Sequence, residues 1–223
     1  IIITSILEYC QRKDLIDVAY TAAKELVINA TKANLKRLIF DKKAYDWQEP
    51  EIYNEGLEEF RSYLSEYSIQ TYEEQFKKKN LPVTATFYFT EDVLNIKVKN
   101  NFSLYPIEER RIREKFSRAH LFSNLVEFYM EHGDNSEGAG LGLTMVSILL
   151  EQSEIDRHSF ILYSSEKYNE TIAKIELPLT DKYISKREMF SKIMEEQDIS
   201  AEQLRTIFDY NYKGYQKLKS LVV

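Results

Sequence analysis

The chain has 223 residues, of which 43% are hydrophobic and 30% are charged, so we expect a folded domain with a conventional core. Its formal net charge of -6 disfavours nucleic-acid binding, which needs a basic surface. The single cysteine, Cys10, excludes an internal disulfide and favours a reducing, cytoplasmic location. No stretch approaches the roughly 20 apolar residues that a membrane helix needs, so we expect no membrane contact.

The first half of the chain is predicted to be mostly helical. Residues 5–36 carry apolar side chains at helical spacing and predict two helices. The apolar run 37–40 predicts a short strand, and residues 41–80, rich in Glu, Lys and Tyr, predict a helical insertion. β-Branched and aromatic residues over 83–89 and 93–98 then predict a β-hairpin.

The second half of the chain is predicted to hold helical residues 107–130, a glycine-bearing loop at 131–140, a helix at 141–152, and hairpin strands at 159–163 and 171–177. Residues 181–223 predict a helical extension, whose last helix begins at a Ser200–Gln203 capping box. The whole order predicts an α+β fold, a two-layer sandwich of a mixed β-sheet with helices on one face, over residues 1–180.

Three polar residues of the second predicted helix carry a first candidate site. Glu25, Asn29 and Lys32 are spaced by four and three, which places them on one helical face. A solvent-exposed stripe would explain such spacing, but the apolar residues beside it favour a pocket next to the core. An Asn oxygen can bind magnesium, a Lys can neutralise phosphate, and a carboxylate can orient or deprotonate a nucleophile.

Glycines directly before the helix at 141–152 carry a second candidate site. Gly138, Gly140, Leu141 and Gly142 lie where backbone amides can approach an anion at the positive end of a helix dipole. No Gly-Lys-Ser/Thr follows, which excludes a Walker loop, and no preceding strand of a βαβ unit supports a Rossmann site. A flexible linker is the alternative interpretation of these glycines.

Taken together, residues 25–32 and 138–143 resemble two motifs of the GHKL superfamily, which includes DNA gyrase, mismatch-repair ATPases and histidine kinases. The first is similar to the N-box, in which the Asn holds magnesium and the Lys approaches phosphate. The second is similar to the glycine box that closes over the triphosphate. The resemblance covers residues 5–179 and implies a Bergerat-type fold with ATP and Mg²⁺ as cofactors and Asn29 as the metal ligand.

Two further stretches bear on this resemblance. Residues 112–118 resemble the aromatic box that starts the ATP lid of the family, which implies that Arg118 contacts phosphate. After the strand ending at Val98, the family has Asp-x-Gly-x-Gly, whose Asp accepts a hydrogen bond from adenine. Here that stretch is 100–104, Asn-Asn-Phe-Ser-Leu, so Asn100 would accept as a neutral and weaker group.

The resemblance implies an ATP- and Mg²⁺-binding kinase or ATPase that transfers or hydrolyses the γ-phosphate. No His precedes Asn29, so we expect the phosphoacceptor to come from upstream or from a protein partner, such as a response regulator. Glu25 is the expected catalytic base. The altered stretch at Asn100 motivates an alternative: a degenerate domain of this superfamily that acts as a regulatory or protein-binding scaffold.

Overall fold

The computed structural model describes residues 1–43, 45–64, 71–119, 122, 125–132, 141–208, 214 and 217, with only the backbone at 118, 119, 129, 131, 132 and 141. Its helices and strands are α1 (Ile2–Tyr9), η1 (Lys13–Leu15), α2 (Ile16–Lys43), α3 (Pro50–Ser62), α5 (Glu73–Lys78), β1 (Val83–Phe89), β2 (Val93–Asn100), α6 (Pro106–Ala119), α7 (Leu125–His132), α8 (Leu141–Gln152), η3 (Arg157–Ser159), β3 (Phe160–Ser165), β4 (Glu170–Pro178), α9 (Lys186–Gln197) and α10 (Ala201–Ile207).

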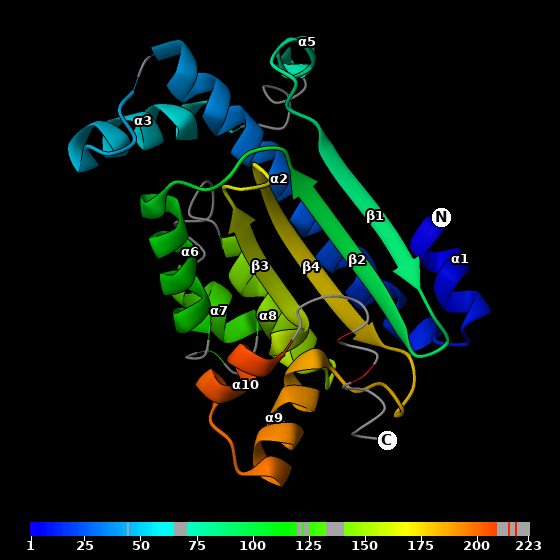
Figure 1. The fold of residues 1–223 in the computed structure, drawn as a ribbon. Helices are drawn as coiled ribbons and strands as arrows, with labels where there is room; N and C mark the ends of the chain where they lie inside the picture. The colour runs from blue at the N-terminus through cyan, green and yellow to red at the C-terminus, as the bar shows by residue number, and fades with distance from the viewer. Residues whose placement is uncertain are drawn as a thin grey trace.

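One four-stranded sheet in the order β1-β2-β4-β3 organises the fold (Figure 1). Both predicted hairpins are confirmed: β1 pairs with β2, and β3 pairs with β4. The two hairpins join through β2 and β4, where Ile96 lies opposite Ile175 and Asn100 lies opposite Thr171. The predicted α+β class is therefore confirmed, although all three pairings are antiparallel and the sheet is not mixed.

Helices α2 and α8 lie behind the sheet in Figure 1 and bury its apolar face. The alternation of β2 directs Leu94, Ile96 and Val98 toward this layer, where all three are buried. They pack with Leu26 of α2 and Val146 of α8 in one continuous core. In the part of the chain that the structure describes, no helix combines the length and apolar character needed to cross a membrane.

The strand predicted at residues 37–40 is wrong, because α2 continues without interruption to Lys43. Leu35 and Ile39 are one helical turn apart and pack together against Phe60 and Leu64 of the insertion. A short apolar run has no periodicity that separates a strand from a buried helix, and here packing against α3 decides for the helix.

The region 41–80 contributes α3 and α5, in agreement with the predicted helical insertion. An aromatic cluster joins it to the domain: Trp47, on the segment before α3, stacks on Phe40 of α2 at 4.2 Å between ring centroids and on Tyr105 at 4.4 Å. The guanidinium carbon of Arg37 lies 4.4 Å from the Trp47 ring centroid. The insertion is thus packed against α2 and against the segment that leads into α6.

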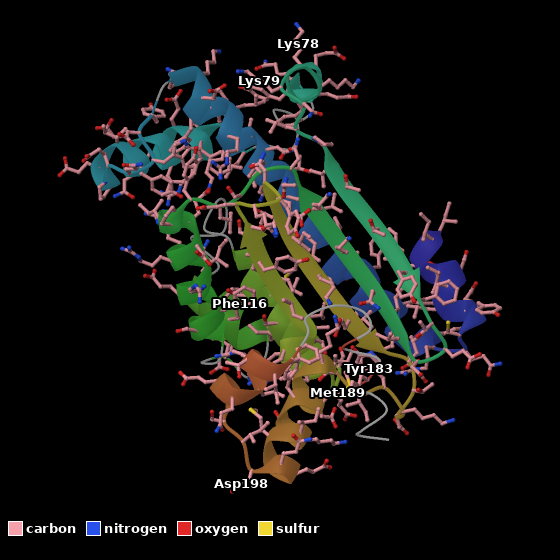
Figure 2. The ribbon with its side chains drawn as sticks, in the orientation of Figure 1. Lys78, Lys79, Phe116, Tyr183, Met189 and Asp198 are labelled. Carbon is pink, nitrogen blue, oxygen red and sulfur yellow. The ribbon has the colours of Figure 1, made fainter. Side chains whose placement is uncertain are left out.

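Helices α9 and α10 form a small unit below the sheet in Figure 1. The predicted capping box is confirmed, since Ser200 and Gln203 exchange side-chain-to-backbone hydrogen bonds of 3.2 and 2.7 Å. Asp198, labelled at the bottom of Figure 2, ends α9 in the left-handed conformation with φ 51°. The unit has its own buried side chains: Ile193, Leu204 and Phe208.

Candidate functional site

Glu25, Asn29 and Lys32 lie half-buried on the middle turns of α2, as their spacing predicts. Nδ2 of Asn29 donates a hydrogen bond of 2.7 Å to the backbone oxygen of Glu25. This bond holds the amide by its nitrogen, which leaves Oδ1 as the atom available to an incoming ligand. Among the described residues, Lys32 has no hydrogen-bond or ion-pair partner.

Gly142, in the first turn of α8, lies directly against the Glu25–Asn29 pair. A Cβ atom built on Gly142 would lie 2.5 Å from Oε2 of Glu25 and 2.7 Å from Nδ2 of Asn29. Both distances are shorter than a van der Waals contact, so only a residue without a side chain fits here unless these groups move. The fold therefore brings the two candidate motifs, more than 100 positions apart in the chain, into contact.

The end of β2 is tied to α2 by an amide pair. Nδ2 of Asn100 donates to Oδ1 of Asn34 at 2.7 Å and to the backbone oxygen of Ala30 at 3.0 Å. Asn34 in turn donates from Nδ2 to the backbone oxygen of Leu81 at 2.6 Å. Asn100 is buried, and its amide hydrogens are engaged with α2. Only its Oδ1 is left to accept a hydrogen bond from a ligand.

The stretch after Asn100 is fixed without the two glycines that the resemblance would require. Thr171, opposite Asn100 in the sheet, donates from Oγ1 to the backbone oxygen of Phe102 at 2.7 Å. Asn169 contacts the same turn, donating to the backbone oxygen of Asn101 at 3.1 Å and accepting from the backbone N–H of Ser103 at 3.3 Å. Side chains of β4 and of the turn before it thus hold this segment in place.

The other predicted site residues are only partly covered by the structure. Gly138 and Gly140, with the predicted loop at 131–140 from residue 133 onward, lie outside the described residues. Leu141 is the first residue of α8, and Arg118 lies in the last turn of α6, but neither side chain belongs to the described part. Their proposed phosphate contacts therefore stay predictions.

An ion-pair group that the sequence reasoning missed docks α6 onto α2. Glu108, in the first turn of α6, is buried and pairs with Lys36 and, at 2.7 Å, with Arg37 of α2. Lys36 follows Lys32 by one helical turn, so extending the Glu25–Lys32 stripe by four positions would have found it. This group ties α6 to α2 one helical turn beyond Lys32.

Lys115 of α6 adds an uncommon cation to this region. The pKa of Lys115 is lowered to about 8, mainly by burial and further by the neighbouring charges of Lys36, Arg111 and Arg61. Desolvation and like charges both disfavour the ammonium form. Among the described residues, Lys115 has no carboxylate partner that would oppose these effects.

Comparisons with known proteins identify a relative of this chain but no function. No family model matches the chain, and no solved structure matches it. The chain is 32% identical over 174 residues to an uncharacterized protein of Treponema pallidum (strain Nichols). This match covers 78% of the chain and 33% of the relative, so the chain spans about a third of that protein's length.

Proposed function

We propose that the chain is a GHKL-type, histidine-kinase-like domain that binds ATP with magnesium between α2 and α8 and transfers or hydrolyses the γ-phosphate. The observation that supports this most is the contact of Gly142 with Glu25 and Asn29. The resemblance implies that the N-box and the second glycine box lie together and bind the same ligand. The contact between the two motifs is the arrangement that the resemblance implies.

The residues of α2 fit a magnesium–phosphate ligand. Asn29, held through Nδ2, presents Oδ1, a hard oxygen of the kind that magnesium prefers. Bound magnesium would neutralise charge on the phosphate oxygens. Lys32, one turn further and without a partner among the described residues, would pair with a phosphate oxygen. Glu25, one turn before Asn29, is placed to orient or deprotonate the attacking group.

At the base end, Asn100 would act only as an acceptor. Its Nδ2 is committed to Asn34 and Ala30, so Oδ1 would accept a hydrogen bond from the amino group of adenine. A neutral amide accepts more weakly than a carboxylate. We therefore expect modest affinity for the base, with most of the binding energy coming from the magnesium–triphosphate end.

The group that receives the phosphate would come from outside these residues. Because no His precedes Asn29, the acceptor would be supplied by an upstream segment or by a partner protein such as a response regulator. A water molecule is the other acceptor, which would make the domain an ATPase. The same proposal includes a cytoplasmic location, because ATP and magnesium are both available there.

Calorimetric titration of the chain with ATP, with and without magnesium, tests the proposal. We expect a Kd of about 10–500 μM with magnesium and at least tenfold weaker binding without it or in Asn29→Ala. Glu25→Gln should keep the affinity and lower hydrolysis or phosphotransfer by about 100-fold. The exposed substitution Glu8→Gln is a matched control. A wild-type Kd weaker than about 1 mM would overturn the proposal.

A second candidate function is a regulatory or protein-binding scaffold of the same fold. It is favoured by one observation: the amide of Asn100 acts as a structural link between β2 and α2. A position used for packing in this way needs no ligand. The scaffold predicts no nucleotide-induced change in thermal stability at millimolar ATP with magnesium, whereas the nucleotide-binding proposal predicts a measurable increase.

A further inference from the structure

Four cationic side chains converge where α2, α3 and α6 meet; we call Lys36, Arg61, Arg111 and Lys115 the cationic cluster. Two of them lie close to the buried ring of Tyr53 on α3. The guanidinium of Arg111 lies 4.7 Å from the ring centroid, and the ammonium of Lys36 lies 5.8 Å from it. Lys36 also lies 3.5 Å from the Tyr53 hydroxyl.

Helical spacing places the other two cations beside these. Lys115 follows Arg111 by four residues and so lies one turn further on the same face of α6. Arg111 donates to Oδ1 of Asn54 on α3 at 2.7 Å, and Arg61 follows Asn54 by seven residues, again on the same helical face. Lys36, Arg111 and Arg61 all lie close enough to Lys115 to disfavour its charged form.

This concentration of positive charge is poorly compensated. Among the described residues, the only carboxylate paired with the cationic cluster is that of Glu108, which Lys36 shares with Arg37. Arg111 has an amide and an aromatic ring as neighbours, both uncharged. Lys115 is half-buried and has no hydrogen-bond or ion-pair partner in the described part of the chain. An unpaired charge that is partly removed from water destabilises the fold unless an anion accompanies it.

We propose that the cationic cluster is a binding site for a phosphate-bearing small molecule with two or more negative charges. Two guanidinium groups offer paired donors to phosphate oxygens, and two ammonium groups add compact charge. Lys36 follows Asn29 by seven residues on α2, so the cluster lies about 10 Å further along this helix. The site does not depend on nucleotide binding at Asn29.

Calorimetric titration of the whole chain with inorganic pyrophosphate, without magnesium and at low ionic strength, tests this site. We expect one equivalent to bind, and Lys115→Met and Arg61→Gln each to weaken binding about tenfold. Pyrophosphate should raise the melting temperature of the wild type and not that of Lys115→Met. Since Lys115 has no partner to lose among the described residues and Arg61 is exposed, both variants should fold.

Two matched substitutions distinguish the cationic cluster from general surface charge and from the Asn29 site. Arg113 is exposed on α6, two residues from Arg111, and is paired with Glu109 at 2.8 Å, so Arg113→Gln should leave pyrophosphate affinity within twofold. Asn29→Ala should also leave it unchanged. Loss of binding in Asn29→Ala with full binding in Lys115→Met would overturn the cluster and keep the nucleotide proposal. Equal losses in Arg113→Gln and Lys115→Met, or no binding by the wild type, would also overturn it.

Discussion

Gly142 and Glu25 belong to different helices, yet a single added carbon on Gly142 would lie 2.5 Å from Oε2 of Glu25. The same carbon would also approach Nδ2 of Asn29. Both atoms are at the ends of side chains, so the fold could accommodate an added carbon if these side chains moved. These are, however, the two groups that the proposed nucleotide site needs. The close packing of α8 on α2 at Gly142 therefore determines where the side chains of Glu25 and Asn29 can lie.

We expect Gly142→Ala to separate binding from stability. The added methyl group should displace Glu25 and Asn29 and weaken binding of ATP with magnesium about tenfold or more. Alanine favours a helix over glycine by about 1 kcal/mol, which should offset the cost of displacing the two side chains. The unfolding free energy should therefore change by less than about 1 kcal/mol. Calorimetry and urea denaturation measure the two quantities. Unchanged affinity in a folded variant would contradict the role assigned to Gly142.

Gly56→Ala is the matched glycine control. A Cβ on Gly56 of α3 would lie 2.5 Å from the ring of Phe40, which is completely buried and stacked on Trp47. A packed ring cannot yield as a flexible side chain can, so overpacking should lower the unfolding free energy by about 1–3 kcal/mol. Nucleotide affinity in the folded fraction should match the wild type.

The amide of Asn100 yields a counterintuitive prediction, because the resembling family has Asp there. Asn100→Asp would direct a carboxylate at two acceptors, Oδ1 of Asn34 and the backbone oxygen of Ala30. We expect it to lower the unfolding free energy by about 3 kcal/mol, and Asn100→Ala by about 1–2 kcal/mol. Urea denaturation at pH 7 measures both. An Asp variant at least as stable as the Ala variant would refute the assigned hydrogen-bond directions.

The acidic limit of stability should depend on Glu176 and Tyr183, the latter labelled beside the lower end of the sheet in Figure 2. Burial by itself would raise the pKa of Glu176, but hydrogen bonds from Lys174 and from the Tyr183 hydroxyl at 2.6 Å outweigh it and lower the pKa. The carboxylate therefore stabilises the folded state above its unfolded pKa, and this contribution is lost as pH falls through the folded pKa.

Tyr183→Phe should remove one of these hydrogen bonds and lower the unfolding free energy at pH 7 by about 1–2 kcal/mol. The difference from the wild type should narrow as pH falls and Glu176 is protonated in both proteins. Urea denaturation between pH 3 and pH 7 measures this, with exposed Tyr20→Phe as the control. A difference that is constant with pH would mean that the hydroxyl does not act through the carboxylate.

Lys115 should make stability depend on pH in the alkaline range. Its charged form destabilises the folded state, whereas the charged form of Glu176 stabilises it. The folded pKa of Lys115, about 8, lies below its ordinary value of 10.5, so the unfolded chain binds the proton more tightly. Stability is therefore reduced below pH 8, rises as pH increases from about 8 to 10.5, and is unaffected by Lys115 above that window. The full effect is about 3 kcal/mol.

Lys115→Met should accordingly be more stable than the wild type at pH 7, with the difference declining toward zero near pH 10.5. Denaturation curves measured from pH 7 to pH 10.5 in buffers without phosphate test this expectation. Lys182→Met, which changes an exposed lysine, should show no such pH-dependent difference. If Lys115→Met is less stable than the wild type at pH 7, then Lys115 has a stabilising partner.

Much of the fold followed from periodicity, because the hairpin strands and the helix at 141–152 have long and consistent patterns. The strand expected at 37–40 failed because a four-residue run holds too little periodicity, and contacts with α3, distant in the chain, determine its structure. The mixed sheet was also wrong, because all three observed strand pairings are antiparallel.

For the site, helical spacing was enough to place Glu25, Asn29 and Lys32 on one face. It could not show that Gly142 touches them, since that depends on how α8 packs on α2. Nor could it reveal that Asn100 uses its nitrogen to bind Asn34, because the direction of an amide is set by its three-dimensional partners. Lys115 was missed because the neighbouring cations that lower its pKa lie on three helices, and their closeness depends on how these helices pack.

The stacking of Trp47 between Phe40 and Tyr105 has a practical consequence. Trp47 is the single tryptophan of the chain, so intrinsic fluorescence excited at the red edge reports on one place. That place is the junction of the insertion with α2 and with the segment entering α6, and not the sheet core. Red-edge tryptophan emission therefore reports on the docking of the insertion without any introduced label.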